Sequence, residues 1–235
     1  MKLLGVLGGM SWESTAVYYR LLNQGVAQRL GGLHSARLLL HSVDFAPVAA
    51  QQAAADWHGA TATLAQAAAG LRAAGAQGLV LATNTMHKAA AEIEAASGLP
   101  LLHIADATGD ALRAAGVRHA ALLGTRFTME DETIVLQPLR QRHGLQLSVP
   151  GADDRALMHR VIYEELCRGV VSDASRSAVV AVIERQRQGG AQAVILGCTE
   201  ITLLIDAACS PLPVYDTTSL HAAAAVQWML DEPAR

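Results

Sequence analysis

Short apolar runs bounded by glycine recur along the chain, at residues 3–7, 79–81, 120–123 and 193–196. They are too short and too continuous for amphipathic helices, so they predict strands buried on both faces, as in a parallel sheet. Longer helix-favouring stretches rich in alanine, such as residues 59–74 and 176–188, lie between them. This alternation predicts βαβ units and an α/β fold.

The same order of landmarks occurs twice, with an offset of about 115 residues. Leu7-Gly8-Gly9 matches Leu123-Gly124-Thr125, and Thr83-Asn84-Thr85 matches Cys198-Thr199-Glu200. We therefore expect two homologous halves related by a pseudo-twofold axis, each a parallel sheet flanked by helices. The expected N-terminal domain covers residues 1–103 and, through a returning C-terminal helix, 216–235; the C-terminal domain covers residues 104–215.

Composition excludes several classes of function. Half of the residues are hydrophobic, 17% are charged and the net charge is −3, which describes a globular chain without a basic surface for nucleic acid. No apolar run reaches the roughly 20 residues of a membrane span. We therefore expect a cytoplasmic protein that has neither nucleic acid nor a membrane as a partner.

Cysteine, histidine and lysine usage narrows the chemistry. Three cysteines without a CxxC pair and nine scattered histidines form neither a disulfide framework nor a recognisable metal site. A Schiff base with pyridoxal phosphate would depend on Lys88, because Lys2 is the only other lysine. Cys167, in a helix predicted at residues 155–168, and Cys209 are interpreted as small buried hydrophobes.

Polar or small residues mark the ends of four predicted strands, at residues 8–11, 83–85, 124–125 and 198–200. Ligands of parallel α/β sheets bind at such ends, where helix N-termini present N–H groups. Each end alone has an ordinary explanation: Gly8-Gly9 as a tight turn, Asn84 and Thr85 as helix caps, Cys198 as a buried hydrophobe. A cysteine that opens a helix also gains thiolate character from the helix dipole, so a lowered pKa is expected for Cys198.

The repeat pairs Cys198 with Thr83, which bears a second protic group at the matching strand end. Stereoinversion needs a base on one face of a carbon atom and an acid on the other. Hydrogen-bond donors at the substrate carboxylate would stabilise the carbanion in place of a cofactor. The sequence therefore predicts an active site in a cleft between two domains that face one another.

Five motifs carry a resemblance to a known family: GGMSWEST at residues 8–15, HSVDF at 41–45, TNTMHK at 83–88, LLGTRFTME at 122–130 and GCTEI at 197–201. They resemble the aspartate/glutamate racemase superfamily, which includes hydantoin racemases, and in particular its broad-specificity amino-acid racemase branch. The resemblance implies two Rossmann-like domains, an amino-acid substrate, no cofactor and a homodimer. The two usual catalytic cysteines fall on Thr83 and Cys198. Because a threonine hydroxyl is a far poorer base than a thiolate, we expect asymmetric racemisation.

The resemblance also implies a set of substrate-binding residues. Asn84, Thr85 and Thr199 would bind the α-carboxylate, and Glu165 would hold the ammonium group. Met10, Ser11, Gln52 and Thr125 would line the cleft. Arg126 follows Thr125 directly and is the candidate for an acidic side chain, although a solvated loop arginine is an equal interpretation. Aspartate or glutamate is therefore expected slightly ahead of neutral amino acids such as homoserine.

Two other functions fit the same residues. The lack of a first cysteine resembles single-cysteine members of the superfamily, such as arylmalonate decarboxylases, which protonate an intermediate from one face. The other alternative is a non-catalytic protein that binds small carboxylates. Carbon dioxide release from malonates, or ligand-induced stabilisation without proton exchange, would distinguish these alternatives from a racemase.

Overall fold

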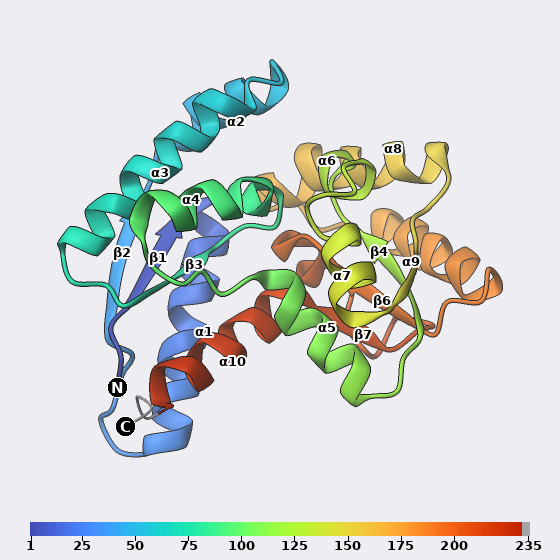
Figure 1. The fold of residues 1–235 in the computed structure, drawn as a ribbon. Coiled ribbons are helices and arrows are strands. Elements are labelled where there is room, and N and C mark those ends of the chain that lie inside the picture. The colour runs from blue at the N-terminus through green and yellow to red at the C-terminus, as the bar shows by residue number, and fades with distance from the viewer. Residues whose placement is uncertain (232–235) are drawn as a thin grey trace. The chain divides into compact units, whose positions relative to one another are not determined.

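The computed structural model describes residues 1–231. In it the chain folds into two α/β units. Unit 1 comprises Met1–His103 and the segment that begins at His221; unit 2 comprises Ile104–Leu220. The chain passes from unit 1 to unit 2 after His103 and returns within its last helix (Figure 1).

The sheet of unit 1 has three parallel strands in the order β2-β1-β3. Leu4 of β1 lies beside Leu38 of β2 and Gly78 of β3. Beyond β3, Leu101 adds a single parallel bridge to Leu79. The elements are β1 (Leu4–Gly8), α1 (Trp12–Leu30), β2 (Leu38–Ser42), α2 (Phe45–Ala53), α3 (Trp57–Ala73), β3 (Gly78–Leu81), the 3₁₀ helix η1 (Thr85–Ala89) and α4 (Ala90–Ser97).

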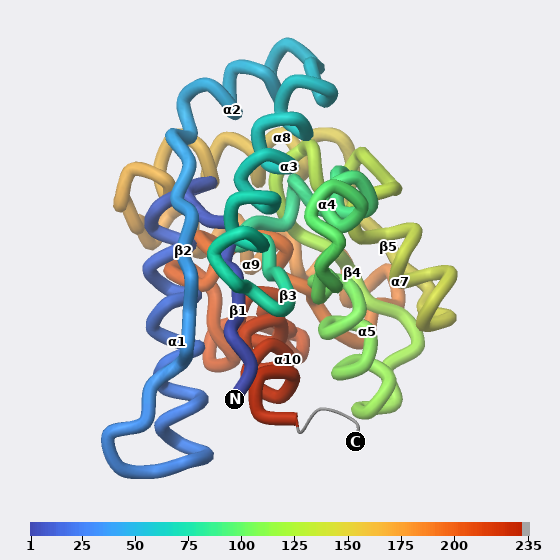
Figure 2. The backbone as a smooth tube through the Cα atoms, turned by 60° about the vertical axis from the view of Figure 1, so that its left-hand side comes forward, coloured from blue at the N-terminus to red at the C-terminus, as the bar shows by residue number. Residues whose placement is uncertain are grey.

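Helices cover both faces of this sheet (Figure 2). Alternate strand residues point to opposite faces, so Leu7, Leu79 and Leu81 pack against α3 and α4, while Leu4 and Val80 pack against α1 and the end of the chain's last helix. Burial on both faces explains why these strands read as continuous apolar runs.

Unit 2 repeats the plan with four parallel strands in the order β5-β4-β6-β7. Leu123 of β4 lies beside Leu196 of β6, as Leu7 of β1 lies beside Leu81 of β3. The elements are α5 (Ile104–Ala114), β4 (His119–Leu123), α6 (Arg126–Glu130), α7 (Leu136–His143), β5 (Gln146–Ser148), α8 (Ala152–Arg160), the π-helical turn η2 (Val161–Glu165), the 3₁₀ turn η3 (Leu166–Arg168), α9 (Asp173–Gln188), β6 (Ala193–Leu196), the 3₁₀ helix η4 (Thr199–Leu203), β7 (Val214–Asp216) and α10 (Thr217–Leu230).

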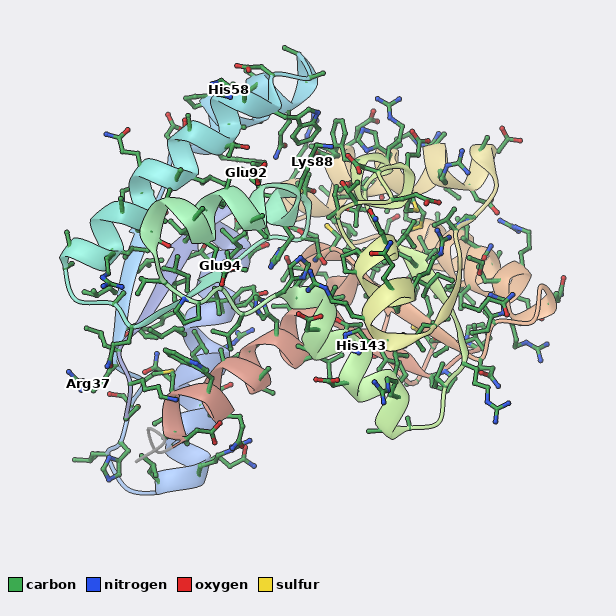
Figure 3. The ribbon with its side chains drawn as sticks, viewed as in Figure 1. Arg37, His58, Lys88, Glu92, Glu94 and His143 are labelled. Carbon is green, nitrogen blue, oxygen red and sulfur yellow. The ribbon has the colours of Figure 1, made fainter. Side chains whose placement is uncertain are left out.

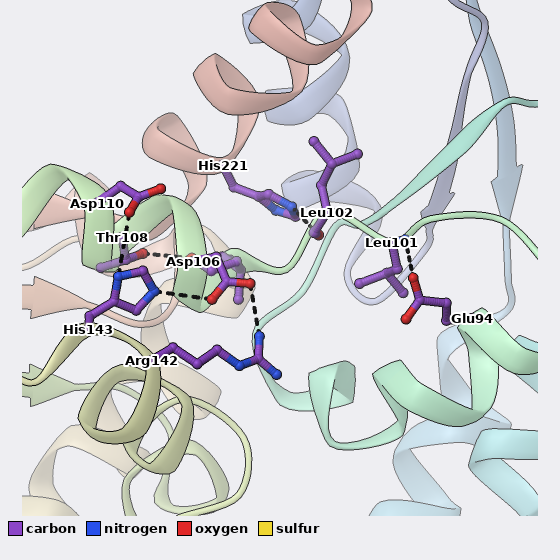
Figure 4. Close-up of polar contacts among 10 residues, drawn as sticks. Glu94, Leu101, Leu102, Asp106, Thr108, Asp110, Arg142, His143 and His221 are labelled. Atoms are coloured by element: carbon purple, nitrogen blue, oxygen red, sulfur yellow. Dashed lines mark hydrogen bonds and ion pairs between the residues drawn. The ribbon is translucent and has the colours of Figure 1, made fainter. Parts of the chain in front are cut away.

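The two faces of the unit 2 sheet are covered by different helices. Ala121, Leu123 and Val194 pack against α8 and α9, whereas Leu122 and Ile195 pack against α5 and α7. Polar contacts join α5 to α7, because Asp106 accepts hydrogen bonds from Arg142 (2.8 Å) and His143 (3.1 Å; Figure 4).

The last helix of each half belongs to the other unit. Helix α5 follows the strands of the first half but packs in unit 2, and α10 follows the strands of the second half but joins unit 1 from His221 onward. None of the helices in the described part of the chain combines the length and apolar character that a membrane crossing requires.

Candidate functional site

The carboxyl end of β1 turns sharply at Gly9. Its φ is +94°, and a Cβ atom there would lie 2.2 Å from the carbonyl oxygen of Val43, so only glycine fits. The Gly9 N–H donates to Thr15 Oγ1 (2.7 Å), and Ser11 caps α1 by accepting a hydrogen bond from the N–H of Ser14. Met10, predicted to line a cleft, is 5% exposed and packs in the core beneath α3.

The carboxyl end of β3 carries the predicted catalytic and carboxylate-binding turn. Thr83 and Thr85 are half-buried and Asn84 is buried. The turn is held from η1, where the imidazole Nδ1 of His87 lies 2.8 Å from the carbonyl oxygen of Thr83. Because β1 and β3 are neighbouring strands, this turn and the Gly9 turn end at the same edge of the sheet.

Gln52 lies on α2 and is buried, with 5% exposure. Its amide Nε2 donates to the sulfur of Met86 in η1 at 3.2 Å. A buried polar side chain requires a specific role, in contrast to the solvated glutamine that is usual on a helix. The contact places Gln52 beside the turn that carries Thr83.

In unit 2 the ends of β4 and β6 meet at one sheet edge. The N–H of Gly197 donates to the carbonyl of Leu123 (2.7 Å), so Thr125 and Cys198 follow neighbouring strands. Thr125 is buried and caps α6 by accepting a hydrogen bond from the N–H of Thr128 (3.3 Å). Thr199 is half-buried and begins η4.

The thiol of Cys198 donates a hydrogen bond to Glu200 Oε2 at 2.9 Å. Burial raises the pKa of this thiol well above its usual value, and the carboxylate of Glu200 raises it further. The predicted lowering of the Cys198 pKa is therefore wrong. The helix that follows is a five-residue 3₁₀ turn, whose dipole is too short to outweigh burial next to a carboxylate.

Glu200 and Tyr163 are site residues that sequence reasoning missed. Glu200 is 8% exposed, and its carboxylate is the hydrogen-bond partner of the thiol. Burial, with smaller contributions from Cys198, Cys167 and Glu200, raises the pKa of Tyr163 to about 12, so its phenol keeps its proton. The motif GCTEI contained the signal for Glu200, because a tight turn brings the side chain two residues beyond a cysteine back to its sulfur.

Two other predicted residues, Glu165 and Arg126, have local partners in unit 2. The carboxylate of Glu165 accepts hydrogen bonds from Ser175 (2.6 Å) and Ser172 (3.3 Å), which join η2 to the start of α9. Arg126 is exposed, and its guanidinium lies 5.9 Å from the ring centroid of Phe127. Cys167 is exposed, so its interpretation as a small buried hydrophobe is wrong, whereas Cys209 is half-buried and packs against the hydrophobic core of unit 2.

Two further kinds of group could hold a cofactor or a metal: a lysine that forms a Schiff base, and a cluster of metal-ligating side chains. The ammonium of Lys88, at the junction of η1 and α4, lies 5.0 Å from the ring centroid of Trp57 (Figure 3). Within residues 1–231, no cluster of three or more His, Cys, Asp or Glu side chains is arranged to hold a metal ion.

Comparison with known proteins gives a consistent set of relatives. A model of the family described as Asp/Glu/hydantoin racemase matches residues 7–225. A protein from Yersinia pestis, provisionally assigned as an Asp/Glu racemase, is 50% identical over 98% of this chain and 100% of its own, with a TM-score of 0.93. An aspartate racemase homologue from Pyrococcus horikoshii is 28% identical over 98% and 100% of the two chains, with a TM-score of 0.83. Aspartate racemase from Picrophilus torridus shares the fold, with 20% identity over 97% and 94% and a TM-score of 0.76.

Proposed function

This chain belongs to the Asp/Glu/hydantoin racemase family, and on that premise we propose that it is an isomerase that racemises a free amino acid without a cofactor. The observation that carries the proposal is the Cys198 thiol at the carboxyl end of β6, hydrogen-bonded to the buried carboxylate of Glu200. A thiol with an adjacent proton acceptor is the arrangement that an activated cysteine requires.

In the proposed reaction, Glu200 takes the thiol proton and the Cys198 thiolate removes the α-proton from one face of the substrate. This proton transfer is uphill, because burial raises the pKa of the Cys198 thiol well above its usual value. A substrate ammonium group near the sulfur would lower the cost by stabilising the thiolate.

Thr83 is proposed to deliver a proton to the opposite face, with its hydroxyl then reprotonated from water. An amino-acid carbanion is a far stronger base than an alkoxide, so the hydroxyl can act as an acid. The reverse step would require the threonine alkoxide as a base, which is scarce at neutral pH. The pair should therefore exchange the α-proton of one enantiomer much faster than that of the other, while inversion keeps the same kcat/KM in both directions because the two enantiomers are equally stable.

The substrate class that we propose is a free acidic amino acid. Asn84, Thr85 and Thr199 follow the two strand ends that carry the acid and the base, which suits a role in holding the α-carboxylate. Arg126 is the proposed partner of a second carboxylate, because its side chain is exposed directly after Thr125.

Incubation of each pure enantiomer of aspartate and glutamate in deuterated water tests the proposal. We expect rapid deuterium incorporation at the α-carbon from one enantiomer of at least one of them, together with a change in optical rotation. The matched variant Cys198→Ser keeps a protic side chain of similar size but should lose exchange, because an alcohol is not deprotonated at neutral pH.

Three results would contradict the proposal. Retained exchange in Cys198→Ser would remove the thiol from the mechanism. Carbon dioxide release from malonates without any exchange of amino acids would identify a decarboxylase. Thermal stabilisation by amino acids without exchange in the wild type would identify a binding protein.

A further inference from the structure

Three histidine rings and one tyrosine gather within unit 1, around the turn that carries Thr83. The ring of His87 lies 4.7 Å from that of His103 and 5.6 Å from that of His221, measured between centroids. The hydroxyl of Tyr18 on α1 lies 2.8 Å from His221 Nδ1. Tyr18, His87 and His221 are 3% exposed or less.

The partners of these rings fix their protonation. The Thr83 carbonyl can only accept a hydrogen bond, so His87 carries its proton on Nδ1. His221 donates from Nε2 to the carbonyl of Leu102 (2.8 Å; Figure 4) and accepts from Tyr18 at Nδ1. Burial lowers the pKa of both His87 and His221, to about 4 for His221, so both rings are neutral at physiological pH.

The cluster also contains the two residues of unit 1 at which the chain leaves for unit 2 and returns from it. His103 is the last residue of unit 1 before the chain enters unit 2, and His221 is the first residue after it returns. His87 therefore contacts both crossover residues with its ring, while its Nδ1 holds the Thr83 turn.

We propose that His87 is a positioning residue, which orients Thr83 by donating its Nδ1–H to the Thr83 carbonyl while His103 and His221 hold the imidazole in place. The proposal rests on the racemase function proposed above. A hydroxyl delivers a proton well only in a narrow range of orientations, and a displacement of about 1 Å can cost about 100-fold in rate. The Thr83 hydroxyl does not ionise by itself at neutral pH. It can therefore transfer its proton only when it is aligned with the carbanion, so it depends on such support.

The test compares His87→Asn with His87→Gln in the full-length protein, because the side-chain amide N–H takes a different imidazole position in each. In His87→Asn the amide nitrogen takes the place of Nδ1, so the hydrogen bond to Thr83 can form. In His87→Gln it takes the place of Nε2, so that bond is lost at similar polarity and volume. Deuterium incorporation and inversion are measured in the same reaction, from the enantiomer on which Cys198 is the base.

The ratio of inversion to exchange separates positioning from packing. Exchange on the Cys198 face needs no group in unit 1 to donate a proton, whereas inversion needs Thr83. At saturating substrate, where weaker binding of the carboxylate by Asn84 and Thr85 affects both rates alike, His87→Gln should lower the ratio of inversion to exchange at least about 10-fold, while His87→Asn should leave that ratio within about threefold. Equal losses of inversion and exchange, or equal inversion in the two variants, would overturn the positioning role.

A measurement on the wild type covers the case in which neither variant folds. Nitrogen chemical shifts of the ¹⁵N-labelled histidines should show His87 as the neutral Nδ1–H tautomer, and a proton on Nε2 alone would overturn the proposal. Absence of both exchange and inversion in the folded wild type, with the expected tautomer present, would instead contradict the racemase function.

Discussion

The ends of β3 and β6 occupy equivalent places in the two units but carry different chemistry. Each strand is followed by a short turn that carries a protic side chain, Thr83 or Cys198, and then by a five-residue 3₁₀ helix. In unit 2 a thiol donates to a carboxylate, whereas in unit 1 a hydroxyl residue is held through its backbone by a neutral imidazole. The duplicated scaffold supplies the positions, and the local partners decide whether a group can act as a base.

The largest expected effect is at the carboxylate of unit 2. Glu200→Gln keeps a hydrogen-bond acceptor near the thiol but cannot take its proton, so α-proton exchange should fall about 10²–10⁴-fold. Exchange by the wild type should rise with pH in the alkaline range, because the raised pKa of Cys198 limits the thiolate. The matched control is Glu184→Gln, a carboxylate on α9 that pairs with Arg187 and should tolerate the change. A Glu200→Gln variant with full exchange would mean that the thiol loses its proton elsewhere.

Acid should act on unit 1 through its buried histidines. His221 has a pKa of about 4 in the fold and about 6.5 when unfolded, so the unfolded state binds its proton first. The stability from this group is complete above about pH 6.5 and declines as the pH falls towards 4, by about 3 kcal/mol in total. Tyr18, His87 and His103 face this ring, and none of them supplies a negative charge to oppose the loss. Urea unfolding between pH 4.5 and 7.5, with the His221 titration followed by NMR, checks this, and a titration midpoint near 6.5 would disprove it.

Making the two strand ends alike should even out the rates of α-proton exchange from the two enantiomers. Thr83→Cys gives unit 1 a group that can act as a base, so exchange from the slower enantiomer should rise about 10-fold or more relative to the faster one. Thr83→Ser retains a hydroxyl and should remain as asymmetric as the wild type. If the ratio for Thr83→Cys equals that for Thr83→Ser, the residue at the end of β3 does not set the asymmetry.

The smallest effect concerns the turn after β1. Thr15→Val removes the acceptor of the buried Gly9 N–H, so we expect a loss of about 1–2 kcal/mol in the free energy of unfolding. Thr63→Val removes an exposed hydroxyl on α3 and is the matched control, with an expected change within about 0.5 kcal/mol. Similar values for both variants would show that the Gly9 hydrogen bond adds nothing to stability.

Features that depend on local pattern could be predicted from sequence, and features that depend on folded neighbours could not. The fold class is confirmed, and β6 was predicted at its observed bounds because both of its faces are buried. The edge strand β2 was missed because it is partly exposed and lacks a continuous buried run. The lowered pKa expected for Cys198 is wrong because the burial of the thiol and the length of the helix that follows it appear only after folding. The burial of Gln52 likewise depends on Met86, which lies 34 residues away.

Helix α5 belongs to the first sequence repeat but packs in unit 2, and α10 belongs to the second repeat but packs in unit 1 from His221 onward. The sequence repeat and the folded unit are therefore not the same segment of chain. A fragment cut after residue 115 would contain the strands of unit 1 but lack α10, which leaves α1 as the only helix over Leu4, Val6 and Val80 in that fragment, while its own α5 would have no sheet to join. Neither repeat is therefore self-sufficient: each one depends on a helix encoded in the other to complete the cover of its sheet.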